Sequence, residues 1–139
     1  MDTAVRLRPV VLQLARELRR ELHALGLTGV QASLLAAVHH HPGIGLRALA
    51  ERERMSAPSM SGHIDRLERA GYVTRTRASE GDRRRVGLAL SAEGGRILRK
   101  IRSRRTAWLA ARLQGLAPAE RAAIDAALEP LARLLEQPA

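Results

Sequence analysis

The sequence predicts a mainly α-helical chain with one small β-hairpin. Apolar residues recur at spacings of three and four along most of the 139 residues, which is the pattern of helices with one buried face. The pattern changes only between residues 72 and 90, where two short segments flank a turn composition. Hydrophobic residues make up 45% of the chain, enough to build a packed core in a single domain.

The first predicted helix covers residues 9–25. Pro9 suits a first helical turn, and Gly26 ends the helix. Its apolar stripe consists of Val11, Leu14, Leu18, Leu22 and Leu25. These spacings of three and four predict that one side of the helix is covered by another apolar surface.

A second helix with a clear start is predicted next. Two shorter helices follow it and precede the hairpin. The motif Thr28-x-x-Gln31 is a capping box that opens this second helix, which ends before Pro42. A short helix follows near residues 46–54. Ser56 then caps a further helix that ends at Gly71. Two helices joined by so short a turn predict a helix-turn-helix unit.

The hairpin follows directly and leads into a long helix. Residues 72–77 and 85–90 are the predicted strands, and the second alternates Val, Leu and Leu with Gly and Ala. Ser91 caps the long helix, which runs to about Gln114. A hairpin placed immediately after a helix-turn-helix predicts a wing, and the second helix of such a unit enters the major groove of DNA.

The last predicted helix opens at Pro118, and Pro130 is expected to kink it or shorten its regular part. Leucines at heptad-like spacing on the first and last helices predict a dimer interface, and the alternative is an ordinary core within one chain. The interface residues are Leu14, Leu18, Leu22, Leu128, Leu131 and Leu135.

Positive charge is concentrated in the middle of the chain. The formal net charge is +10, and residues 47–105 hold 16 basic and 7 acidic residues. This distribution predicts a polyanion-binding centre flanked by assembly helices. The alternative is a solvated surface in a chain whose composition favours arginine, because only one of its 24 basic residues is lysine.

Three segments carry a resemblance to a known family. MSGHIDRLERAGYVTR resembles the recognition helix and wing start of MarR-family transcriptional regulators, and SEGDRRRVGLALSAEG resembles their wing signature. LTGVQASLLAAV resembles their second helix, so the likeness covers about residues 25–135. The sequence departs from the family pattern at Ser79 and Gly81 in the wing, and at Gly62, where arginine is frequent.

The resemblance implies one MarR-like chain, residues 1–139, with three kinds of segment. Residues 1–26 and 116–139 would form the dimerisation helices, 28–91 the winged helix-turn-helix lobe, and 92–115 a connecting helix. It implies a homodimer on double-stranded DNA at a pseudo-palindromic operator, usually as a repressor. It also allows for release by a small, often aromatic or phenolic, ligand bound between the dimer helices and the lobes.

Candidate DNA contacts lie on the recognition helix and the wing. Short serines let a helix approach the groove floor, and arginine is a permanently charged donor suited to a narrow minor groove. The alternative is that these are small or solvated surface positions. The resemblance also implies that one wing arginine braces an acidic residue, with Arg84 and either Asp65 or Asp82 as the expected pair. The DNA-binding set is Ser56, Pro58, Ser59, Ser61, His63, Arg66, Arg75, Arg83, Arg84 and Arg85.

Four residues are candidates for an effector pocket: His23, Gln31, His39 and Trp108. A lone Trp on a helix is also typical of a core or an interface. The run His39-His40-His41 suggests a metal site, but adjacent helical residues point about 100° apart and cannot all bind one ion. We therefore expect neither a metal nor a cofactor.

Several classes of function are disfavoured. Aromatic residues are 1% of the chain, whereas proteins that read single strands stack bases on aromatic side chains. There is no cysteine, no apolar run of the roughly 18 residues that span a bilayer, and no signal-peptide pattern, so we expect a cytoplasmic protein without a membrane partner. No catalytic motif is found, so an enzyme is not expected. The alternative function is a non-specific architectural DNA-binding protein.

Overall fold

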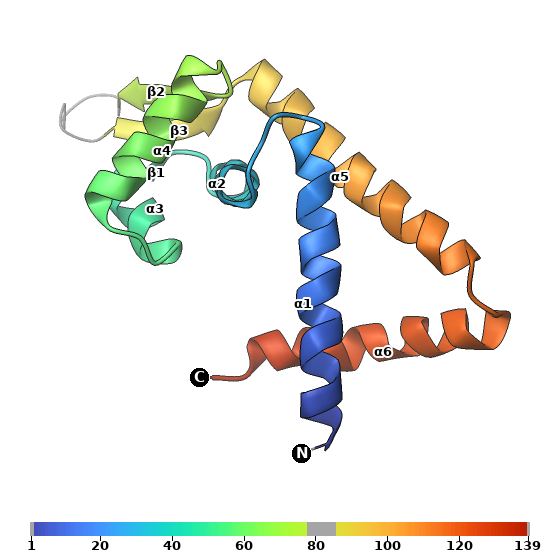
Figure 1. The fold of residues 1–139 in the computed structure, drawn as a ribbon. Helices are drawn as coiled ribbons and strands as arrows, with labels where there is room; N and C mark the ends of the chain where they lie inside the picture. Colours follow the sequence, from blue (N-terminus) through green and yellow to red (C-terminus); the bar gives the residue numbers. More distant parts are fainter. Residues whose placement is uncertain (1, 78–85, 139) are drawn as a thin grey trace. The chain divides into compact units, whose positions relative to one another are not determined.

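The computed structural model describes residues 2–77 and 86–138, and it confirms a mainly helical chain with a small sheet (Figure 1). The chain divides into two compact units, residues 1–105 and 106–139, which are described separately. Within the described residues, no helix is both long and apolar enough to cross a membrane. The elements in chain order are α1 (Asp2–His23), α2 (Gly29–His40), β1 (Ile44–Gly45), α3 (Leu46–Arg52), α4 (Ala57–Arg69), β2 (Val73–Arg77), β3 (Val86–Leu90), α5 (Ala92–Gln114) and α6 (Pro118–Glu136).

The predicted helix starts are confirmed by side-chain caps. The backbone N–H of Gln31 donates to the Thr28 hydroxyl over 3.2 Å, and the Gln31 side chain accepts from the Thr28 N–H over 2.9 Å. The Ser56 hydroxyl accepts from the N–H of Ser59 at the start of α4. At α5, the Ser91 hydroxyl accepts from the N–H of Gly94 and donates to the carbonyl of Gly71. Each cap satisfies a backbone donor that the helix itself leaves without a partner.

Each terminal helix contains a proline in its interior. α1 begins at Asp2, so placing Pro9 in the first turn was wrong. A proline keeps a φ compatible with the helix and removes one backbone donor, which an otherwise favourable segment can tolerate. The carboxylate of Asp2 stabilises the positive end of the helix dipole and lies 3.8 Å from the Arg6 guanidinium. α6 likewise continues past Pro130 to Glu136, which excludes a shortened helix.

The sheet has a third strand that the sequence pattern did not predict. Its order is β1-β3-β2, all antiparallel, with Val73 opposite Leu90 and Ile44 opposite Leu88. β1 is only two residues long and has no alternation to detect. Gly87 makes the pairing sterically feasible, because a Cβ there would lie 2.9 Å from the carbonyl oxygen of Gly43.

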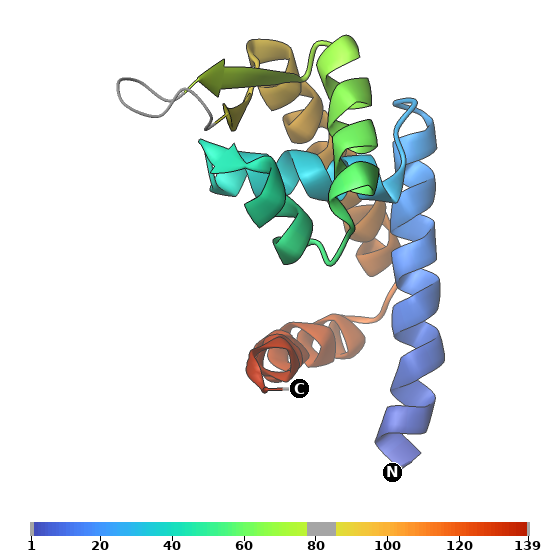
Figure 2. The same cartoon turned by 90° about the vertical axis from the view of Figure 1, so that its left-hand side faces the viewer.

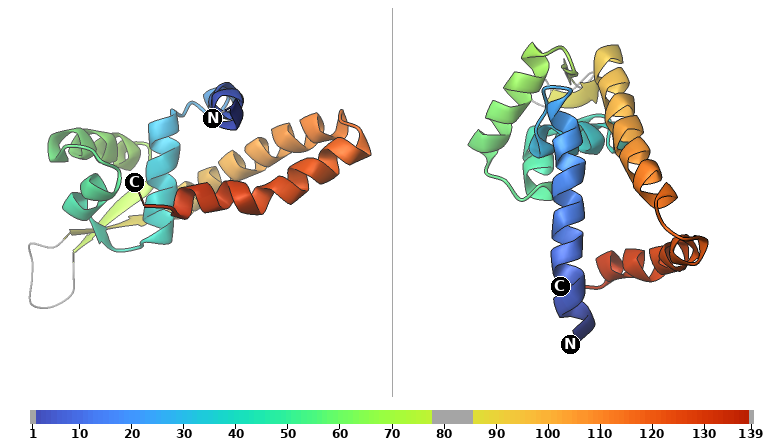
Figure 3. Two further views of the ribbon diagram at one scale, coloured as in Figure 1. Left: turned by 90° about the horizontal axis from the view of Figure 1, so that it is seen from below. Right: turned by 45° about the vertical axis from the view of Figure 1, so that its right-hand side comes forward.

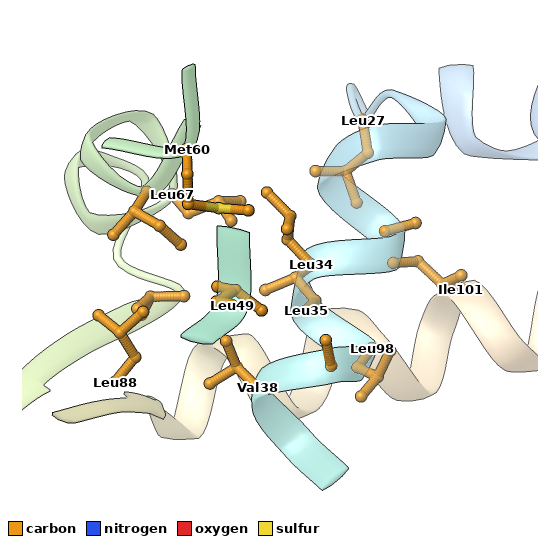
Figure 4. Packing of buried hydrophobic residues seen from close by; sticks show 14 of the residues in the cluster. Leu27, Leu34, Leu35, Val38, Leu49, Met60, Leu67, Leu88, Leu98 and Ile101 are labelled. Carbon is orange, nitrogen blue, oxygen red and sulfur yellow. The ribbon is translucent and has the colours of Figure 1, made fainter. Parts of the chain in front are cut away.

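The core of residues 1–105 is built around α2. Figure 4 shows Met60 and Leu67 of α4 pointing towards Leu34 of α2, while Leu98 and Ile101 approach α2 from α5. Figure 3 shows α3 and α4 on one side of α2 and the start of α5 on the other. All of these core side chains are buried. The core therefore fixes α4 by one face and leaves its other side uncovered.

We expect Gly94→Ala to destabilise the protein strongly. A Cβ at Gly94 would overlap the backbone carbonyl oxygen of Tyr72, which a rotamer change cannot relieve. Overpacking of this kind costs about 1–3 kcal/mol, to be measured as the free energy of urea unfolding. Gly95→Ala is the matched control, because its Cβ would meet only the flexible end of Arg99 at 3.6 Å. That variant should be neutral or slightly stabilised by helix propensity, and equal stability of the two variants would contradict the close packing of α5 on Tyr72.

Candidate nucleic-acid interface

The helix α4 presents one apolar side and one polar side. Met60, Ile64 and Leu67 are fully buried in the core. Pro58 and Arg66 on the remaining surface are exposed. Figure 2 looks onto this side of the unit and shows α4 uncovered by its other elements, with the hairpin strands beside it. A helix held this way can enter a major groove without disturbing the core.

The start of α4 combines a cap with small side chains. Ser56 is occupied as the N-cap, while Ser59 is exposed and Ser61 is half-buried. The first turn carries no acidic residue, so the positive helix end is not neutralised locally. Small side chains and unopposed backbone N–H groups suit close approach to a DNA backbone. Contact of Pro58, Ser59 and Ser61 with DNA remains a prediction.

Arg66 and His63 form a contact pair on the polar side of α4. A guanidinium nitrogen of Arg66 lies 3.3 Å from His63 Nδ1. The same guanidinium lies back over Gly62, where a Cβ would be 3.9 Å from its second terminal nitrogen. This backward course agrees with the tilt of helical side chains towards the N-terminus. The sequence predicts both residues as DNA contacts but does not predict that they contact each other.

Arg75 proves to be an internal partner of α4. From β2, its guanidinium binds the carboxylates of Asp65 and of Glu68, the latter over 3.1 Å. These two ion pairs give Arg75 a structural role that the sequence did not predict, and its contact with DNA remains a prediction. They also give Asp65 a partner other than the expected Arg84. The three charges tie the wing strand to the recognition helix.

We expect Arg75→Gln to weaken DNA binding about tenfold. The substitution leaves Asp65 and Glu68 as two uncompensated carboxylates beside the predicted DNA-binding surface. Binding should be measured by fluorescence anisotropy at fixed salt. In the triple variant that adds Asp65→Asn and Glu68→Gln, affinity should return, because no free carboxylate remains. If the triple variant binds as weakly as the single one, Arg75 itself contacts DNA and the internal role is wrong.

The wing tip lies outside the described residues. Arg83, Arg84 and Arg85, together with Asp82, therefore keep the roles that the sequence predicts for them.

The helix-turn-helix carries exposed arginines that are not among the predicted DNA contacts. Arg69 is exposed in the last turn of α4, and Arg47 is exposed on α3. Arg54, in the turn between the two helices, is exposed and adopts a left-handed φ of 54°. A non-glycine residue in this conformation costs about 1–2 kcal/mol, so the turn is held by its surroundings. Their charge was visible in the sequence, but their exposure depends on how α3 and α4 pack.

The predicted pocket residues are placed in two units. His23 and His39 are exposed in residues 1–105, and the His39 ring contacts His40 edge-to-face. Gln31 forms the capping box through its side-chain oxygen, and its place in an effector pocket remains a prediction. Trp108 belongs to residues 106–139, where the Arg112 guanidinium lies 5.0 Å from its ring centre. Among the described residues, no three His, Asp or Glu side chains form a metal-binding group.

The predicted dimer residues are mostly exposed apolar side chains. On α1, Leu14 is 41% exposed and Leu18 is half-buried. Leu22 is fully buried in the core of its own chain, so its assignment to the dimer interface was wrong. On α6, Leu128, Leu131 and Leu135 are all exposed. The structure adds further exposed apolar residues on these helices, namely Val5, Val10, Val11, Leu12, Ile124 and Leu134.

Comparisons with known proteins agree on one family. Residues 25–85 match the model described as the MarR family. An HTH-type transcriptional regulator of Mycobacterium bovis, Mb0904, is 31% identical and the match covers 91% of this chain and 88% of the relative. A candidate transcriptional regulator from Pseudomonas aeruginosa is 31% identical with a TM-score of 0.87, over 99% of this chain and 96% of that one. Streptococcus pneumoniae FabT, solved in complex with DNA, shares the fold at 20% identity and a TM-score of 0.72, over 96% of this chain and 97% of that one.

Proposed function

The chain belongs to the MarR family of transcriptional regulators, and from this premise we propose that it is a cytoplasmic repressor that binds a pseudo-palindromic DNA operator as a homodimer. The observation that carries the proposal is α4. Its apolar side is locked into the core, and its polar side carries Ser59, Arg66 and Arg69 without cover from the rest of its unit. The DNA complex of FabT, a protein of the same fold, supports double-stranded DNA as the partner.

In the proposed complex, two copies of α4 enter successive major grooves about 10 bp apart. The hairpins would reach the adjacent minor grooves, with Arg83 and Arg85 as the wing contacts and Arg75 holding the hairpin to α4. Exposed arginines of α3 and α4 would add phosphate contacts that fix the protein on the duplex. The groove contacts then select the sequence.

We propose that the apolar residues of α1 and α6 form the dimer interface. α6 has no buried residue in the single chain, and its exposed leucines follow helical spacing. Burying such side chains contributes about 25 cal/mol per Å² of apolar area. A second copy of the chain is the partner that a symmetric operator requires.

A small-molecule effector would act by favouring a spacing of the two recognition helices that no longer fits the groove repeat. The candidate effector-contacting residues remain those that the sequence suggests: His23, Gln31 and His39 in residues 1–105, and Trp108 in residues 106–139. By thermodynamic linkage, such an effector must bind the free dimer more tightly than the DNA-bound dimer. Equal affinity of an effector for both forms would refute this switch.

The experiment that tests the proposed function is a competition between specific and random duplexes. Duplexes selected by the purified protein should compete at least about 10³-fold better than random DNA of the same length at physiological salt. A ratio near one would instead identify an architectural binder without sequence preference. A reporter placed behind the selected site should fall when the protein is present, and a rise would make it an activator.

A further inference from the structure

The Arg66 guanidinium is held in place by its two neighbours on α4, His63 and Gly62. Arg66 has only donor groups, so its 3.3 Å contact with His63 Nδ1 requires that nitrogen to accept. The imidazole tautomer with no proton on Nδ1 fits this contact. The half-buried imidazole thus lies directly against the exposed Arg66 guanidinium.

Gly62 leaves the space that this arrangement uses. The Arg66 guanidinium lies over the helix at Gly62, with a terminal nitrogen 3.9 Å from where a Cβ would stand. A longer side chain at position 62 would occupy that space. Arg66 is thereby drawn back by about one turn along the polar side of α4, to His63 and Gly62.

We propose that Arg66 reads a guanine in each operator half-site and that His63 is its positioning residue. The inference rests on the proposed function and specifies the base that it recognises. A guanidinium can donate two hydrogen bonds to O6 and N7 of guanine, a pattern that no other base offers in the major groove. Because His63 already holds the Arg66 side chain before DNA binds, Arg66 loses less conformational entropy on binding.

The test uses the full-length protein and a library of randomised duplexes, followed by sequencing of the bound fraction. Wild-type protein should select a short inverted repeat. One position in each half-site should be guanine in the wild-type selection, and Arg66→Ala should no longer select guanine there. The guanine preference at that position should fall by roughly 5- to 150-fold. Arg66→Lys should retain binding but not this preference, because an ammonium is not a planar fork.

Replacing that guanine by 7-deazaguanine identifies the contact directly. The modified base lacks the N7 acceptor, so it should weaken wild-type binding and have no further effect on Arg66→Ala. Arg69→Ala is the matched control on the same helix, and it should weaken all sequences equally without changing any base preference. If Arg69→Ala removes the same preference, or if Arg66→Ala leaves every preference intact, the inference is overturned.

The positioning role of His63 has its own variants. His63→Leu removes the acceptor and should lower the guanine preference by a larger factor than it lowers affinity for random DNA. His63→Asn offers an oxygen near the place of Nδ1 and should restore the preference. Equal loss in both variants would overturn the positioning role. Wild-type protein that selects no sequence overturns the proposed function itself, whereas a selected site that is indifferent to Arg66 overturns only this inference.

Discussion

A chain that carries Leu128→Glu and Leu135→Glu is expected to be a monomer that binds its operator roughly 10²- to 10⁴-fold more weakly than the wild type. These side chains are 56% and 89% exposed in the single chain, so glutamate there does not disturb a core. In a dimer interface, however, it would bury charge without a partner. Light scattering should give the mass of one chain, 15.2 kDa, against twice that mass for the wild type.

The matched control introduces the same charge on the opposite side of α6. Ala122 and Ala126 are exposed and lie about half a turn from the leucine stripe. Ala122→Glu with Ala126→Glu should remain dimeric and keep its operator affinity. If wild-type protein at micromolar concentration gives the mass of a single chain in light scattering, the proposed dimer is wrong.

Removing two wing arginines is also expected to weaken operator binding strongly and to reduce its dependence on salt. In Arg83→Ala with Arg85→Ala, operator affinity should fall, and the slope of log K against log salt should decrease by roughly two to four units per dimer. The lower figure holds if alternation along the hairpin directs only one of the two arginines to DNA. The measurement is a salt titration of binding.

The control for the wing removes two equal charges from residues 106–139. Arg112→Ala with Arg133→Ala should leave the salt slope unchanged, because only arginines that meet phosphate release counterions. A wing variant with wild-type affinity and slope would contradict a DNA-binding role for the wing.

Local features of the fold were predictable from the sequence. The caps at Thr28, Ser56 and Ser91 depend on residues three apart, and the structure shows the expected hydrogen bonds at each. The class of fold followed from these caps and from the change in apolar spacing at the hairpin. The family followed from segments that keep their order along the chain.

Features that depend on packing were not predictable. One apolar stripe runs along α1, but Leu22 is buried and Leu14 is exposed, because only the end of α1 meets the core. The Arg75 ion pairs join a strand to a helix and need the folded hairpin to form. Gly62 carried no visible role until the course of Arg66 over it was known.

Sequence-specific binding to DNA can be tested by sequencing the genomic fragments that the purified protein captures at roughly 150 mM salt. A short inverted repeat whose half-sites lie about 10 bp apart should be enriched, with its copies concentrated near promoters. The genes beside it would name the regulated functions and narrow the effector. Even capture across the genome, with no shared repeat, would contradict a sequence-specific regulator.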